Sequence, residues 1–252
     1  MDLQLHDRVV LVTGGSRGIG RACVEALADE GARVAFCARD ADGVRRAVEE
    51  LAAAGRTVRG TPVDVADAEA LGAWVRSCAE ELGGIDAVVA NVSALAIPST
   101  EANWQASFQT DMLGTVRLVD AALPWLEASG AGAVVTISSV SGREIDFAAG
   151  PYGTFKGAIV HYTQGLAHQL AGRVRANSVS PGNVYFPGGV WASIESSDPD
   201  LYARALDLNP TGRMARPEEV ARAVTFLASP AATFVSGTNL VVDGALTRGV
   251  QL

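Results

Sequence analysis

A glycine-rich segment between a short apolar run and a helical pattern constrains the fold of this chain most strongly. The run from Arg8 to Thr13 contains Val-Val-Leu-Val without helical period, which suits a strand buried on both faces of a parallel sheet. Gly14-Gly15-Ser16-Arg17-Gly18-Ile19-Gly20 follows, and a helical pattern then continues to near Gly31. Glycines let a backbone approach a pyrophosphate, and a helix N-terminus favours its charge. The unit therefore predicts a dinucleotide-binding turn, although a glycine cluster alone also fits an ordinary tight turn.

Strand-like and helix-like segments alternate through the rest of the chain. Predicted strands cover residues 33–38, 57–63, 85–90, 133–137, 174–179 and 239–242. Predicted helices cover residues 40–54, 67–82, 103–126, 152–170 and 217–228. This order predicts an α/β fold: one Rossmann-type, doubly wound sheet of about seven parallel strands with helices on both faces. The 252 residues suit a single dinucleotide-binding and catalytic domain, residues 1–252.

The stretch from Pro181 to Arg216 shows no regular pattern. It holds several prolines and glycines together with Tyr185, Phe186 and Trp191. A loop of this length inside a compact domain is usually functional or disordered, and the aromatic residues argue against disorder. We expect a mobile lid, around residues 183–216, over the carboxyl ends of the strands, where such sheets bind ligands. The alternative is a surface excursion packed on the core or on a neighbouring subunit.

Composition limits the partners and the compartment. The net charge is −8 without a basic run, which argues against nucleic acid or an anionic membrane as a partner. The three cysteines are scattered and suggest no metal or redox site, as expected in a reducing compartment. Neither a signal-peptide pattern nor a membrane-length apolar run is found. We expect a cytoplasmic protein that acts on small molecules.

The only lysine of the chain, Lys156, lies four residues after Tyr152, and the other nineteen cations are arginines. On a helix these two side chains share one face, a turn apart. An ammonium beside a phenol stabilises the phenolate, which makes the hydroxyl a usable proton donor and acceptor. The pair alone could be an accident of an exposed helix. Ser139 at a predicted strand end and the preceding dinucleotide unit favour a catalytic site.

These features together resemble the short-chain dehydrogenase/reductase family, essentially from end to end. The resemblance is carried by Thr13–Gly20, Asp64, Asn91, Ser139, Tyr152, Lys156 and Pro181-Gly182. The tail from Pro210 to Gly244 looks like the branch that contains 3-oxoacyl-[acyl-carrier-protein] reductases. The resemblance implies hydride transfer between a nicotinamide and a carbonyl/alcohol pair.

The resemblance also implies a role for each matching residue. Tyr152 would donate or accept the proton at the substrate oxygen, and Ser139 would hydrogen-bond that oxygen. Ser138 is its rival, but the thirteen-residue distance to Tyr152 fits Ser139. Lys156 would assist Tyr152 and hold the nicotinamide ribose. Asp64 and Val65 would border the adenine, Asn91 would lie along the cofactor, and the Val184 backbone would meet the carboxamide. The other implied cofactor contacts are Gly14, Ser16, Arg17, Gly18, Ile19, Gly20, Pro181 and Gly182.

The end of the second predicted strand indicates the cofactor. An acidic residue there would bind the adenosine ribose and repel a 2′-phosphate, but this chain has Ala38 followed by Arg39. Arg17 can approach the same region, and arginine binds phosphate bidentately. We therefore predict NADP(H) in preference to NAD(H). The alternative is that Arg39 is solvated and Asp40 contacts the ribose.

The chain departs from the family pattern at three places. Asp111 stands where a fourth catalytic residue, asparagine, is usual, and an ionised aspartate can only accept hydrogen bonds. A main-chain role, in which the carbonyl holds a water that reaches Lys156, could survive this change. A carboxylate near Lys156 would favour the charged lysine, so we expect an active enzyme with a modified proton relay. Val92-Ser93 replaces the common Ala-Gly after Asn91, and Phe186 replaces a small hydroxyl residue.

Apolar residues on segments expected to border the site suggest a hydrophobic ketone or secondary alcohol as substrate. They are Leu95, Ile97, Ile145, Phe147, Tyr185, Phe186 and Trp191. A 3-oxoacyl-[acyl-carrier-protein] reductase is the alternative, and a weakly catalytic cofactor-binding protein with a regulatory or assembly role is an alternative of another class. The long apolar helices 103–126 and 152–170 suggest a homotetramer or homodimer.

Overall fold

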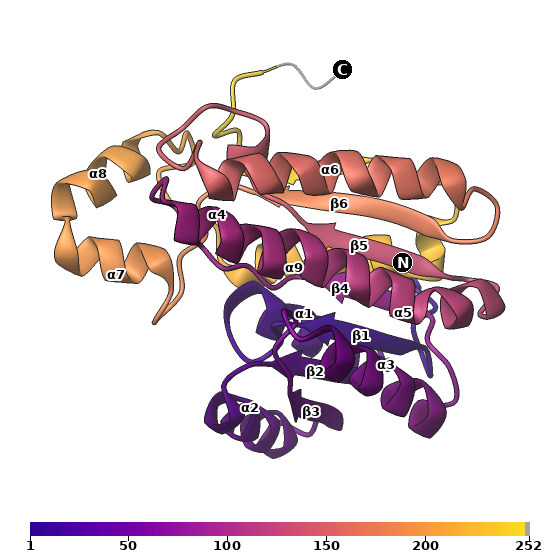
Figure 1. The fold of residues 1–252 in the computed structure, drawn as a ribbon. Helices are drawn as coiled ribbons and strands as arrows, with labels where there is room; N and C mark the ends of the chain where they lie inside the picture. Colours follow the sequence, from indigo (N-terminus) through magenta and orange to yellow (C-terminus); the bar gives the residue numbers. More distant parts are fainter. Residues whose placement is uncertain (250–252) are drawn as a thin grey trace.

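A seven-stranded parallel sheet runs through the molecule in the computed structural model, which describes residues 1–249 (Figure 1). The strand order is β3-β2-β1-β4-β5-β6-β7, and every neighbouring pair is parallel. From β1 to β3 successive strands are added toward one edge of the sheet, and from β4 to β7 toward the other edge. The strand order therefore reverses between β1 and β4, and sheets of this kind bind ligands at that point. The predicted fold is confirmed. The strands are β1 (Val9–Thr13), β2 (Arg33–Ala38), β3 (Val58–Pro62), β4 (Ala87–Ala90), β5 (Ala133–Ile137), β6 (Arg175–Pro181) and β7 (Asn239–Val242).

Helices pack on both faces of the sheet because the strands alternate their side chains between two cores. Val10 and Val12 of β1 enter one core, whereas Val9 and Leu11 enter the other. The first core is closed by α1 (Gly18–Asp29), α2 (Ala41–Ala53) and α9 (Pro217–Ala228). The second is closed by α3 (Ala68–Leu82), α5 (Gly114–Ala128) and α6 (Pro151–Gln169).

The helix expected over residues 103–126 is interrupted. The structure has α4 (Glu101–Ser107), then a π-helical segment at Phe108–Leu113, then α5. A π-helical turn holds an extra residue and is found frequently at functional sites. Asp111 lies inside this segment and is buried.

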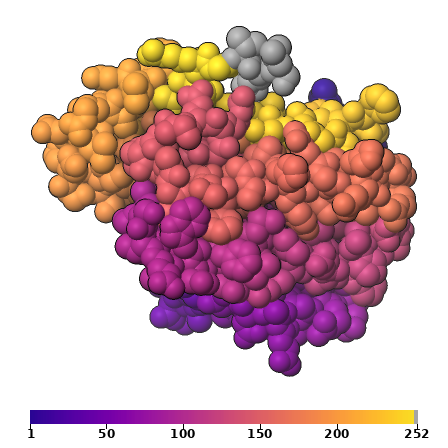
Figure 2. All heavy atoms as spheres, turned by 45° about the horizontal axis from the view of Figure 1, so that its top comes forward, coloured from indigo at the N-terminus to yellow at the C-terminus, as the bar shows by residue number. Residues whose placement is uncertain are grey.

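From its prolines and glycines we had expected the stretch from 181 to 216 to be irregular, but the structure shows regular helices there. It contains α7 (Val190–Ser197) and α8 (Pro199–Asp207), which form a lobe at one end of the molecule (Figures 1 and 2). Asp198 accepts a hydrogen bond from the Leu201 amide at 3.0 Å, and Pro199 takes the first helical position. A capping aspartate followed by proline is a helix-start signal, so this helix was readable from the sequence. Trp191, Ala205 and Met214 form a small core of the lobe.

No helix within residues 1–249 combines the length and the apolar character needed to cross a bilayer.

Candidate active site

A cavity of about 1040 Å³ lies at the carboxyl ends of the strands. This volume exceeds the usual range for small-molecule pockets and leaves room for an extended cofactor beside a small substrate. Segments that follow β1, β2, β4, β5 and β6 line it. Every residue predicted to bind the cofactor is in its wall, as is Ser139: Gly14, Ser16, Arg17, Gly18, Ile19, Gly20, Arg39, Asp64, Val65, Asn91, Tyr152, Lys156, Pro181, Gly182 and Val184. Asp111 is not among the lining residues and lies behind Lys156.

The glycine turn places the first residues of α1 in the wall of the cavity. Gly14 has φ +72°, and a Cβ on Gly20 would lie 2.1 Å from the Gly14 carbonyl oxygen. Arg17, the N-cap of α1, makes no side-chain capping hydrogen bond, and the first turn of α1 has no acidic residue. In contrast, Asp40 caps α2 and Asp67 caps α3. An uncapped helix N-terminus at a cavity fits an anionic group, so the turn fits a phosphate-bearing cofactor.

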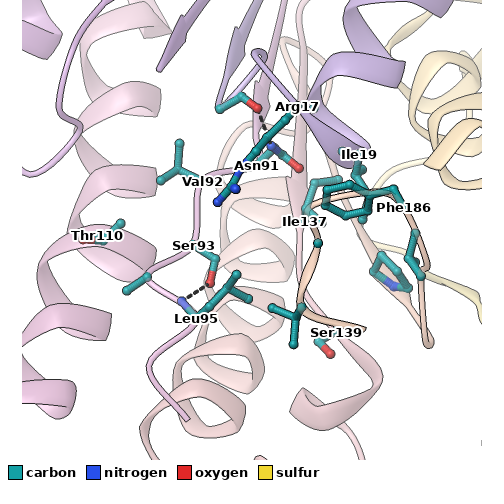
Figure 3. A pocket seen from close by; sticks show the side chains of 18 of the residues that line it. Arg17, Ile19, Asn91, Val92, Ser93, Leu95, Thr110, Ile137, Ser139 and Phe186 are labelled. Atoms are coloured by element: carbon teal, nitrogen blue, oxygen red, sulfur yellow. Dashed lines mark hydrogen bonds between the residues drawn. The ribbon is translucent and has the colours of Figure 1, made fainter. Parts of the chain in front are cut away.

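Asn91 ties the end of β4 to this turn. Its side-chain amide donates to the carbonyl oxygens of Thr13 (3.1 Å) and Gly14 (3.3 Å), and its own amide donates to the Thr13 hydroxyl (3.1 Å). Figure 3 shows Asn91 between the turn and the segment leading to Leu95. Asn91 therefore holds the turn in shape.

The segment after Asn91 accommodates the loss of the usual glycine. Ser93 accepts a hydrogen bond from the Leu95 amide at 3.1 Å, and Leu95 takes a positive φ of 50°. This region is uncommon for a branched side chain. Leu95 therefore carries local backbone strain in the wall of the cavity.

Ser139, Tyr152 and Lys156 come together where β5 ends and α6 begins. Ser138 donates its hydroxyl to the Lys156 carbonyl oxygen at 2.7 Å, whereas Ser139 only accepts, from the Ser141 amide at 3.2 Å. The Ser139 hydroxyl thus keeps its hydrogen for the cavity, which supports Ser139 over Ser138 as the substrate-facing serine. The Lys156 ammonium lies 5.6 Å from the centre of the Tyr152 ring and donates to the Ile137 carbonyl oxygen at 3.0 Å.

Phe186 lies on the glycine turn. A Cβ on Gly18 would be 2.6 Å from its ring, and one on Gly189 would be 2.9 Å away, so the ring is held between two glycines. Figure 3 shows Phe186 beside Ile19. The Arg17 guanidinium also donates to the Gly188 carbonyl oxygen at 3.5 Å. The departure at Phe186 therefore replaces a polar contact by apolar packing between the turn and the start of the lobe.

Two arginines line the end of the cavity near β2. Arg39 is exposed there, and Arg46 of α2 lines the same wall. The Asp40 carboxylate caps α2, because it accepts a hydrogen bond from the Asp42 amide at 3.2 Å. The same carboxylate lies 3.8 Å from the Arg46 guanidinium. Arg46 is a candidate that the sequence patterns did not indicate, because its direction depends on how α2 packs on the sheet.

The substrate end of the cavity is less apolar than we had expected. Ile145 and Tyr185 do not line it, and Ile145 is almost fully exposed. Five of the expected apolar residues do line it: Leu95, Ile97, Phe147, Phe186 and Trp191. Polar residues join them, namely Thr110, Ser141, Asp146 and Ser193. The Ser141 hydroxyl donates to Asp146 at 2.6 Å, a contact within the loop after β5 that strand and helix patterns do not reveal.

The three cysteines lie in the two cores rather than in the cavity wall. Burial raises the pKa of Cys23 and of Cys37 to about 12, so these thiols stay protonated at neutral pH. Residues 1–249 contain no group of three or more His, Cys, Asp or Glu side chains placed to hold a metal ion.

A doubly wound sheet with an open glycine turn and a Ser-Tyr-Lys set defines an oxidoreductase of the dinucleotide-binding class. A family model described as "Enoyl-(Acyl carrier protein) reductase" matches residues 14–247. Isoepoxydon dehydrogenase patN of Penicillium expansum is 40% identical over 248 residues, which cover 96% of this chain and 95% of that protein. The chain belongs to the short-chain dehydrogenase/reductase family, whose members act on alcohols and ketones with a nicotinamide cofactor.

Other relatives share the whole length of the chain. Cis-4-hydroxycyclohexanecarboxylate dehydrogenase of Sinomonas cyclohexanicum is 35% identical over 250 residues, which cover 96% of this chain and 97% of that protein. The NADPH-bound structure of a short chain oxidoreductase from Pseudomonas aeruginosa PAO1, described as containing an atypical catalytic center, has a TM-score of 0.89 and 31% identity. The match covers 98% of this chain and 99% of that one.

Proposed function

We propose that this protein transfers a hydride between NADP(H) and a small ketone or secondary alcohol. The observation that carries the proposal is one cavity with Ser139, Tyr152 and Lys156 at one end and the exposed Arg39 at the other. When bound, the nicotinamide supplies or takes the hydride.

The chain's own residues handle the proton and the substrate oxygen. During reduction, the Tyr152 hydroxyl gives its proton to the carbonyl oxygen, and Ser139 donates a hydrogen bond to the same oxygen. The nearby Lys156 ammonium stabilises the phenolate that remains. During oxidation the same groups act in reverse.

The charge balance near β2 supports NADP(H). Three carboxylates line the cavity near β2 and β3, but Glu50 pairs with Arg21 at 3.0 Å, Asp40 caps α2, and Asp64 accepts the Ala66 amide at 2.9 Å. Arg39 forms no ion pair within residues 1–249 and is available for a 2′-phosphate.

Arg39→Leu should raise the KM for NADPH about 10- to 100-fold while changing the KM for NADH little, because a charge-assisted hydrogen bond to phosphate is lost. Steady-state kinetics with both cofactors measure this. Arg45→Leu is the matched control, since Arg45 pairs with Asp42 at 2.9 Å and does not line the cavity. A wild-type enzyme that clearly prefers NADH would rule out the cofactor assignment.

The cavity and the relatives favour a small alicyclic substrate with polar substituents. Apolar walls of Leu95, Phe147 and Trp191 suit ring faces, and the Ser141-Asp146 pair can accept hydrogen bonds from hydroxyl groups. One relative is named a cis-4-hydroxycyclohexanecarboxylate dehydrogenase and another an isoepoxydon dehydrogenase. A panel of cyclic and linear ketones and alcohols, assayed with NADPH and NADP⁺, tests this. Turnover of linear ketones alone would contradict the alicyclic assignment.

Reduction of a 3-oxoacyl-[acyl-carrier-protein] is the second candidate, favoured by the description of the matched family model. An acidic carrier requires a basic docking surface. Arg143 is exposed near the cavity, but Glu144 is exposed beside it, and the net charge is −8. A small-molecule substrate is therefore preferred. NADPH binding without turnover of any panel member would instead favour the regulatory or assembly role.

We further propose that residues 1–252 act as one domain, with residues 183–216 as a lid, and that the chain forms a homodimer or homotetramer in the cytoplasm. An aromatic cluster on the outer face supports assembly: Phe155 lies 6.0 Å from Trp104 and 5.8 Å from Phe108, measured between ring centres. Trp104 and Phe108 are each more than a third exposed. Light scattering of the purified protein measures the subunit number.

A further inference from the structure

Asp111 and Lys156 form an ion pair that is closed off from solvent. The Asp111 Oδ1 and Lys156 Nζ atoms are 3.4 Å apart, and their side chains are 1% and 2% exposed. In the part of the chain that the structure describes, the next most buried cation of an ion pair is Arg21, at 16%. Lys156 reaches the cavity wall, but Asp111 does not, so the carboxylate lies behind the lysine.

The side chain of Asp111, rather than its main chain, faces the lysine. The Asp111 carbonyl oxygen accepts the Thr115 hydroxyl at 2.7 Å. The second carboxylate oxygen, Oδ2, accepts the Ala94 amide at 2.9 Å. Ala94 lines the cavity in the segment after β4, so one carboxylate joins the lysine to a second wall of the site.

The lysine has a limited number of donors. An ammonium carries three N–H groups. The Ile137 carbonyl oxygen takes one at 3.0 Å, and Asp111 lies on a second side. The Asp111 Oδ1 atom forms no hydrogen bond in the part of the chain that the structure describes, so its contact with Lys156 is ionic. A hydrogen bond on one side and an opposing charge on another hold the ammonium in place, and its remaining donors are left for the cavity, where Tyr152 lies.

Burial makes the pair interdependent. A buried charge without a partner is strongly unfavourable, and removing one member leaves the other in that state. The π-helical segment at Phe108–Leu113 carries Asp111. A π-helical turn is rare and is found frequently at functional sites, and here it carries the buried partner of the lysine.

We propose that the Asp111 carboxylate is a positioning residue that holds the Lys156 ammonium directed at the cavity and links it to the Ala94 segment. Asp111 does not line the cavity, so it contacts neither the substrate nor the cofactor. This revises the expectation that it acts as a catalytic residue. Asparagine at this position could accept the Ala94 hydrogen bond but would supply no opposing charge. The expected effect of Asp111 on turnover rests on the proposed function, whereas the ion pair between Asp111 and Lys156 does not.

The pairing is tested by a double-mutant cycle on thermal unfolding of the cofactor-free protein. Asp111→Asn and Lys156→Met should each lower the unfolding midpoint by about 5–10 °C, because each leaves a buried partner uncompensated. The double variant should unfold at a higher temperature than the sum of the two losses predicts. Additive losses would overturn the pairing. If Asp111→Asn does not fold alone but the double variant does, the pairing is supported.

The positioning role is tested by kinetics and by NADPH binding, followed through its fluorescence. Asp111→Asn should lower kcat about 10- to 100-fold and weaken NADPH binding several-fold, with the KM of the carbonyl substrate within about twofold, because only the lysine is misdirected. Asp120→Asn, an exposed aspartate on α5, is the matched control and should match wild type. Wild-type kcat and NADPH affinity in Asp111→Asn would overturn the role. A wild type inactive on every substrate would refute the proposed function, while the unfolding cycle and NADPH binding would still decide the role of Asp111.

Discussion

Tyr152→Phe should reduce turnover about 10²- to 10⁴-fold while leaving NADPH affinity within about twofold. The substitution removes one hydroxyl and keeps the ring, so the cavity wall is retained but the proton donor is lost. Ser139 and Lys156 remain in place and can still orient the substrate oxygen. Initial rates on the best substrate of the panel give kcat, and fluorescence titration gives the dissociation constant of NADPH.

Tyr162→Phe provides the matched control, because Tyr162 is on the same helix and outside the cavity wall. Its buried hydroxyl has no hydrogen-bond partner among residues 1–249, and burial raises its pKa. Removing that hydroxyl should leave kcat unchanged and should not lower stability, since no hydrogen bond is lost. If Tyr152→Phe keeps more than a tenth of wild-type kcat, Tyr152 is not the proton donor.

Gly20→Ala should destabilise the fold by about 3 kcal/mol, because its Cβ would lie 2.1 Å from the Gly14 carbonyl oxygen. The nearest atoms are main-chain atoms of Gly14 and the side-chain amide of Asn91 that holds the turn, so the turn must move. We expect the unfolding midpoint to fall by roughly 6–12 °C and NADPH binding to be lost. Thermal unfolding and fluorescence titration measure the two effects.

Gly72→Ala is the control for Gly20→Ala, since Gly72 lies within α3. A Cβ there would meet only the end of the Arg76 side chain, at 3.3 Å. Alanine favours the helix over glycine by about 0.5–1 kcal/mol, so this variant should be as stable as wild type or slightly more stable. Equal stability of the two variants would show that the turn is not as tight as the structure indicates.

Strands β1, β2, β4 and β5 were predictable because a parallel sheet buried on both faces demands short apolar runs. The helix over residues 103–126 was predicted as continuous because a π-helical segment has no apolar signature of its own. The lobe around Trp191 was predicted as irregular because prolines and glycines were taken as loop signals. Pro199 instead begins a helix, with Asp198 as its cap.

The site was predictable where chemistry depends on a local motif. The glycine turn and the Tyr152–Lys156 spacing each lie within a few residues, so the sequence carries them directly. Arg46 and the Ser141-Asp146 contact were missed, because helix packing and a loop conformation direct them. Asp111 was recognised as a departure, but its placement behind Lys156 was not.

By itself the sequence determined the parallel α/β fold, the glycine-rich turn between the first strand and helix, and the presence of one lysine beside a tyrosine. These follow from residue type and local spacing, which act over one strand or one helical turn. Only the tertiary structure decided that Ser139 rather than Ser138 has a free hydroxyl hydrogen, and that the Asp111 carboxylate faces Lys156. Asp111 and Lys156 lie 45 positions apart, and their contact exists because two helices and a strand end bury them together, where each charge requires the other.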